Sequence, residues 1–101
     1  MKRTVLLVPF LILGACEVQK TPVPTGGSKA DALVDMSYDV GGLEVPVVDW
    51  TAAAASAAKR CAAWGYRKAD AFEGTRTQCH SRDMYGNCSM ATVTKTYQCT
   101  N

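Results

Sequence analysis

The chain has 101 residues, of which 48% are hydrophobic and 20% are charged, so it suits a single globular domain with a modest core. Its 11 Lys+Arg and 9 Asp+Glu give a net charge of +2, and the first fifteen residues hold Lys2 and Arg3 but no acid. A chain without that segment would be neutral, which excludes the basic excess of nucleic-acid-binding proteins and predicts no nucleic-acid partner.

Residues 1–15 have the order of a secretory signal peptide. Lys2 and Arg3 form a positive start, residues 5–13 form an apolar run, and two small residues end the segment. The run is too short to span a bilayer, which takes about 20 apolar residues. A buried N-terminal strand is the alternative, but it would not explain the order of charged, apolar and small residues. We therefore predict a signal peptide over residues 1–15.

The stretch Leu13-Gly14-Ala15-Cys16 resembles the lipobox of bacterial lipoproteins. The resemblance implies that the chain is cut before Cys16, that the Cys16 thiol receives a diacylglycerol, and that the new amino group is acylated with a fatty acid such as palmitate. One acyl chain anchors a protein only marginally, whereas three would hold it on the membrane. Glu17 stands where an aspartate would imply retention at the inner membrane. In a Gram-negative host we therefore expect an outer-membrane protein whose domain faces the periplasm.

Residues 16–30 are predicted to be the lipidated N-terminus and a flexible tether. Residues 17–30 contain two prolines, two adjacent glycines and scattered polar side chains, which bury too little apolar surface to become ordered. Between Ala32 and Val40, apolar and polar residues alternate, which predicts a half-buried strand. The following segment should be extended or irregular, because Pro46 blocks a helix and disfavours a central strand.

An alanine-rich helix is predicted over roughly residues 50–64. Asp49 is a good N-cap, and Gly65 stands where helices commonly end. Spacings of three and four residues predict one stripe that faces the core, formed by Trp50, Ala54, Ala57, Cys61 and Trp64.

The remaining chain is predicted to be β-structure. Residues 67–80 indicate one bent strand or two short ones broken at Gly74, residues 81–87 a turn-rich loop, and residues 89–99 a closing strand. The order β-α-β-β predicts a single α+β domain over residues 31–101, with one helix packed on a small antiparallel sheet and stapled by disulfides.

Four cysteines remain once Cys16 is assigned to lipid, and an exported small domain favours disulfides. Four cysteines allow three connectivities. Cys61 and Cys99 lie on the apolar faces of their elements, and Cys79 and Cys88 flank one loop, so Cys61–Cys99 with Cys79–Cys88 is favoured. The alternative is a Cys₃His zinc site that includes His80. It is disfavoured because adjacent strand residues point to opposite faces and the spacing fits no zinc ribbon.

No stretch has the pattern of an active site. His80 is the only histidine, no serine lies in a GxSxG context, and the glycines at 26–27 lack the strand and helix of a phosphate loop. We therefore predict neither catalysis nor a cofactor. Large aromatic side chains should fill the space beside the alanine-rich helix, namely Trp50, Trp64, Phe72 and Tyr97. Tyr85, in the polar loop, should be exposed.

A wider resemblance covers nearly all of residues 25–100. From TGGSKADALVDMSY through CAAWGYRKADAFEGTRTQC to VTKTYQC, the chain is similar to the YecR-like lipoproteins, most specifically around Cys61, Trp64-Gly65-Tyr66 and Phe72. The resemblance implies a small bacterial lipoprotein without known enzymatic activity. Members are linked to flagellar gene regulation in enteric bacteria, which implies an accessory envelope role. It supplies no binding or catalytic residue to carry over.

Two functions from different classes follow. The first is a non-catalytic envelope lipoprotein that contacts the membrane through its lipid and an envelope or flagellar protein through its domain. The alternative is a periplasmic inhibitor of a lysozyme-like enzyme. Lysozymes are basic, so an inhibitor should present acidic surface. The neutral charge of the shortened chain disfavours the inhibitor but leaves room for a local acidic cluster.

Overall fold

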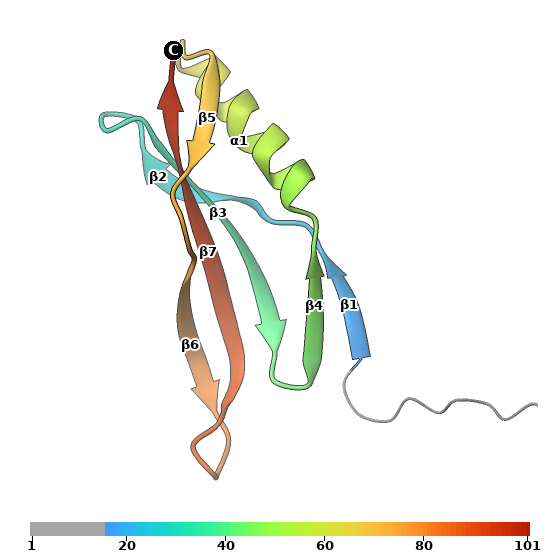
Figure 1. The fold of residues 1–101 in the computed structure, drawn as a ribbon. Helices are drawn as coiled ribbons and strands as arrows, with labels where there is room; N and C mark the ends of the chain where they lie inside the picture. The colour runs from blue at the N-terminus through green and yellow to red at the C-terminus, as the bar shows by residue number, and fades with distance from the viewer. Residues whose placement is uncertain (1–15) are drawn as a thin grey trace, which may run out of the picture.

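The computed structural model describes residues 16–101, so the predicted signal peptide lies outside the described residues. In chain order the elements are β1 (Cys16–Lys20), β2 (Val23–Ser28), β3 (Leu33–Gly41), β4 (Glu44–Val48), α1 (Trp50–Ala63), β5 (Lys68–Ala71), β6 (Arg76–Arg82) and β7 (Cys88–Thr100) (Figure 1). The predicted class, an α+β domain with one helix on an antiparallel sheet, is confirmed, although strands are more numerous than the β-α-β-β order implied. None of the helical structure described for residues 16–101 is long and apolar enough to cross a membrane.

The five-stranded main sheet is built around β7, which is 13 residues long. One edge of β7 pairs with β3 over residues 90–98, and the other edge pairs first with β6 and then with β5. Strand β2 extends the sheet beyond β3. The register sets Val34 opposite Tyr97 and Tyr38 opposite Val93, so apolar residues of both strands share one face.

The predicted tether over residues 17–30 is wrong. Strand β1 pairs in parallel with β4, and β2 pairs antiparallel with β3. The glycines that suggested disorder instead permit close backbone approach, because a Cβ on Gly27 would collide with the Leu33 carbonyl, and Gly27 has φ +128°. Pro46, which disfavoured a central strand, lies in β4, and β1 is the one ladder partner of β4 among residues 16–101.

Helix α1 begins as predicted. The Asp49 carboxylate accepts a hydrogen bond from the backbone N–H of Ala52 at 2.9 Å and so caps the first turn. The fully buried helix residues are Ala53, Ala57 and Cys61, spaced by four. The predicted stripe was therefore partly wrong, because Ala54 is exposed. The alanines allow α1 to approach the sheet closely.

The core lies between α1 and the face of the main sheet that carries Val34, Met36 and Tyr97. Burial raises the pKa of Tyr97 above its usual value, because desolvation disfavours the phenolate. Trp50 is half-buried and packs edge-on against Tyr38, with ring centroids 6.0 Å apart. Trp64 also packs against the core and is half-buried.

One predicted core aromatic is not in the core. Phe72 is 49% exposed, because β5 ends at Ala71 and the chain turns at Gly74 before β6 begins. Tyr85 is 81% exposed, as the polar loop around it predicted.

Two disulfides staple the fold. Cys61 of α1 joins Cys99 of β7 with Cα atoms 5.3 Å apart, and Cys79 of β6 joins Cys88 of β7 with Cα atoms 5.9 Å apart. This is the connectivity favoured from the sequence. The zinc alternative is wrong, because its three sulfurs are all held in disulfides. His80 lies within β6 rather than at a loop edge, with Nε2 2.6 Å from the Thr92 hydroxyl.

Candidate functional site

The residue predicted to carry lipid is part of a strand. Cys16 is the first residue of β1 and lies opposite Glu44, the first residue of β4. The other end of β1 is fastened by a hydrogen bond from the Asp49 backbone N–H to the Lys20 carbonyl, 2.9 Å long. No spacer therefore separates Cys16 from the fold, whereas the sequence predicted one of about fourteen residues. Lipid attachment itself stays a prediction.

Glu44 holds the start of β4 in place. Its carboxylate accepts a 2.7 Å hydrogen bond from the Gly41 backbone N–H and lies 3.1 Å from the Lys20 ammonium. Both contacts favour the charged form, and the backbone hydrogen bond, followed by Lys20, lowers the pKa of Glu44 below its usual value. The group is stabilised as a structural anion, so it is poorly suited to act as a general base.

The face of the main sheet that α1 does not cover is polar. We call it the polar face; its central residues are Asp35, Ser37, Asp39, Thr92, Thr94 and Thr96. Ser37 is only 3% exposed, and its hydroxyl lies 2.8 Å from those of Thr25 and Thr94. Hydroxyls of β2, β3 and β7 thus form one chain across three strands.

The carboxylates of the polar face are already engaged within the chain. Asp35 accepts hydrogen bonds from Thr96 at 2.7 Å and from the Arg76 guanidinium at 3.1 Å. Asp39 accepts one from Thr92 at 2.6 Å. Side chains whose hydrogen bonds are satisfied internally stiffen a sheet but are not poised for proton transfer.

A shallow hollow of about 400 Å³ lies beside Arg76, where the chain turns between β5 and β6. Phe72 and Thr94 are among its lining residues. Among residues 16–101 no group of three or more His, Cys, Asp or Glu side chains is arranged to hold a metal ion. Besides this aromatic wall and threonine hydroxyls, the lining includes the charged side chains of Glu73 and Arg76.

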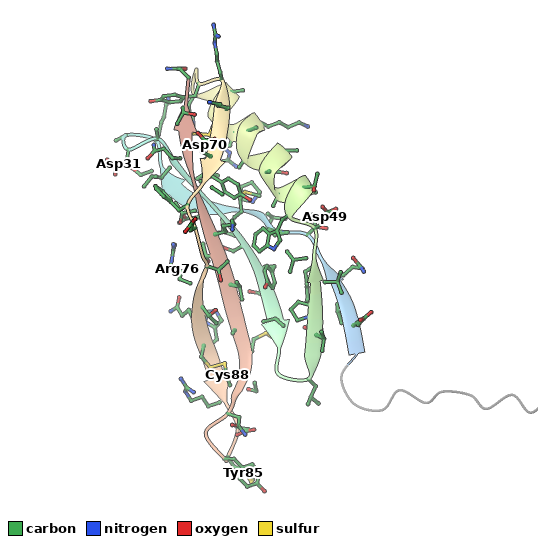
Figure 2. The ribbon with its side chains drawn as sticks, viewed as in Figure 1. Asp31, Asp49, Asp70, Arg76, Tyr85 and Cys88 are labelled. Atoms are coloured by element: carbon green, nitrogen blue, oxygen red, sulfur yellow. A yellow bond between two sulfur atoms is a disulfide. The ribbon has the colours of Figure 1, made fainter. Side chains whose placement is uncertain are left out.

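A second hollow, of about 690 Å³, lies where the turn between β3 and β4 meets the start of β7. The Gly42 backbone N–H donates to the Ser89 carbonyl at 3.0 Å, and a Cβ on Gly42 would approach the Cys88 carbonyl oxygen to 2.8 Å. Leu43 and Met90 line this hollow, and so do Asp83 and Asn87, which flank the loop that carries Met84 and Tyr85. All four apolar side chains are exposed, and we call them the apolar end: Leu43, Met84, Tyr85 and Met90. Figure 2 places Tyr85 at the extremity of this end.

Sequence reasoning missed the apolar end as a group. It predicted that Tyr85 is exposed, but Leu43 lies some forty residues away along the chain. The two segments meet because β3 and β7 pair with Gly41 opposite Met90. The only sequence signal was the presence of large apolar residues inside turn-rich segments, at LEVP and DMYGN.

Comparison with known proteins places the chain in one family. The sequence model of the YecR-like lipoproteins matches residues 21–100, from just after β1 to the end of β7. No curated protein matches the chain.

Proposed function

The chain belongs to the YecR-like lipoprotein family, and from this premise we propose that it is a lipid-anchored, non-catalytic protein of the bacterial envelope. Cys16 carries the lipid, and the domain acts as an interaction or accessory module. The family match carries the proposal. It is supported by the lipobox-like residues before Cys16.

The proposed compartment is the periplasmic face of the outer membrane. Two disulfides in a domain this small are typical of an oxidising compartment outside the cytosol. Glu17, in place of an aspartate, supports outer-membrane sorting. We further propose that the domain binds a flagellum-associated protein, and the family resemblance supports this partner.

The lysozyme-inhibitor alternative receives less support from the polar face. An inhibitor of a basic enzyme needs carboxylates that are free to pair with the enzyme's cations. Asp35 is paired with Arg76, and Asp39 is bonded to Thr92. A lytic assay with several lysozymes, with and without the protein, tests the alternative, and we expect no inhibition.

Intact mass spectrometry of the protein extracted from its native membranes tests the proposal directly. We expect the mass of a chain that starts at acylated Cys16, with a gain of four hydrogens on reduction. A Cys16→Ser variant serves as control and should lose the acyl mass and leave the membrane fraction. A chain that retains residues 1–15 without lipid would contradict the proposal.

A further inference from the structure

The most exposed large apolar side chains of the described residues lie at one end of the domain. Of the large apolar side chains that the structure describes, the three most exposed are Leu43 at 86%, Met84 at 86% and Tyr85 at 81%. All three belong to the apolar end, and Met90 nearby is 42% exposed. Scattered apolar residues on a surface are ordinary, but large ones gathered at one place indicate a contact with an apolar partner.

The loop that carries Met84 and Tyr85 has a defined, hydrogen-bonded conformation. The Asp83 carboxylate accepts hydrogen bonds from the Tyr85 and Asn87 backbone N–H groups at 2.8 and 2.9 Å. The Gly86 backbone N–H donates to the Asp83 carbonyl at 3.0 Å, and Gly86 adopts φ +86°. The Cys79–Cys88 disulfide fastens the strands behind the loop. Met84 and Tyr85 are therefore held out into solvent by a turn with its own hydrogen bonds.

The same end is where the chain would enter the fold from the membrane. Cys16 lies opposite Glu44, and Glu44 directly follows Leu43. Figure 1 shows the starts of β1 and β4 and the loop between β6 and β7 at one end, with α1 toward the other. Because β1 begins at Cys16, a lipid on that residue holds this end against the bilayer.

The charges near the apolar end are few and of both signs, and they include the exposed Glu17. Lys20 is paired with Glu44, and the Arg82 guanidinium donates to the Gly86 carbonyl beside Asp83. Such a surface does not depend on anionic lipid for binding. Leucine and methionine favour the acyl region, and tyrosine favours the headgroup level of a bilayer.

We propose that Leu43, Met84 and Tyr85 dock the domain onto the surface of the phospholipid bilayer that holds the Cys16 lipid. The proposal rests on the proposed function, since it needs the lipid at Cys16. The contact fixes the orientation of the domain, so that α1 points away from the membrane and the polar face stands free along its side. The anchor therefore sets both the location and the orientation of the module.

Fluorescence of the lipidated full chain in vesicles of zwitterionic phospholipid tests the docking. Tyr85→Trp places the probe at the apolar end, and Phe72→Trp is the matched control, because it replaces another exposed aromatic side chain beside the main sheet. Wild-type protein supplies the background from Trp50 and Trp64. We expect brominated acyl chains to quench residue 85 and not residue 72. Leu43→Ser with Met84→Ser should reduce the quenching, and both side chains are too exposed for their loss to threaten folding.

Each other outcome overturns the docking. If mass spectrometry of the same sample confirms lipid on Cys16 but residue 85 is not quenched, the domain does not dock and the proposed function survives. Equal quenching at residues 85 and 72 would mean an unoriented domain. A blue-shifted probe at residue 85 that brominated lipid does not quench would mean that protein covers the apolar end. A chain without lipid on Cys16 would remove the proposed function and the docking together.

Discussion

Cys16 and Glu44 lie opposite each other in the parallel ladder of β1 and β4. The pairing makes the residue predicted to carry lipid part of the fold itself. We therefore expect the domain to contact its membrane directly through the apolar end, rather than to be connected to it by a flexible linker.

Limited trypsin digestion tests whether β1 is structured in solution. Cleavage after Lys20 should be slow, because its side chain is only 19% exposed and its carbonyl accepts the Asp49 backbone N–H. Cleavage after Lys29 should be faster, because Lys29 is exposed in the turn between β2 and β3. Mass spectrometry of the early fragments measures both rates. Equal rates would mean that residues 17–30 behave as the flexible tether that their composition predicted.

The stability of the β3–β4 turn should depend on pH through Glu44. The pKa of Glu44 is lowered in the folded state, first by the Gly41 backbone hydrogen bond and then by Lys20. Its stabilising contribution is therefore complete above the usual glutamate pKa and is lost as the pH falls through the lowered folded value. Urea unfolding of wild type and Glu44→Gln over a series of pH values should show a difference that shrinks in acid. A difference independent of pH would argue against these contacts.

The two disulfides should contribute unequally to stability. Cys61 and Cys99 are 38 positions apart, whereas Cys79 and Cys88 are 9 apart. The chain-entropy relation gives about 4 kcal/mol for the long loop and about 3 kcal/mol for the short one. Paired alanine replacements compared by urea unfolding measure both, and each pair is the control of the other. The buried Cys61–Cys99 pair also loses core contacts, so a smaller loss for that pair would contradict the prediction.

The N-cap of α1 predicts a graded response at position 49. Asp49→Ala should lower the free energy of unfolding by about 1 kcal/mol, because the Ala52 backbone N–H loses its acceptor. Asp49→Asn keeps a side-chain oxygen and should cost only a few tenths of a kcal/mol. Thermal unfolding of the two variants distinguishes the lost cap from a loss of charge, which both variants share.

The adjacent glycines of β2 should differ sharply in their tolerance of alanine. Gly27→Ala puts a Cβ against the Leu33 backbone at a φ of +128° and should cost about 1–3 kcal/mol or more. At Gly26 an added Cβ meets only the Asp35 carboxylate, at 3.7 Å. Similar unfolding midpoints for both variants would mean that residues 26–27 are not held against β3.

Local patterns predicted the elements that local forces specify. The Asp49 cap and the alanine run located α1 within about one residue, and the alternation from Ala32 located β3. The prediction that Phe72 lies in the core was wrong, because hydrophobicity alone does not show whether a residue belongs to a strand or to the turn that follows it. Composition misjudged residues 17–30, because strands can be ordered by backbone hydrogen bonds to distant partners without burying large side chains.

The sequence by itself determined the helix and its cap, the alternation that gives the sheet an apolar and a polar face, and the favoured pairing of four cysteines. Only the tertiary structure brought Cys16 opposite Glu44 and placed Leu43 at the same hollow as Asp83 and Asn87, which flank Met84 and Tyr85. The physical reason is the sequence separation over which each interaction acts. Capping and periodicity act within a few residues, whereas strand register joins residues as far apart as Leu33 and Gln98, and no local pattern records which segments will meet.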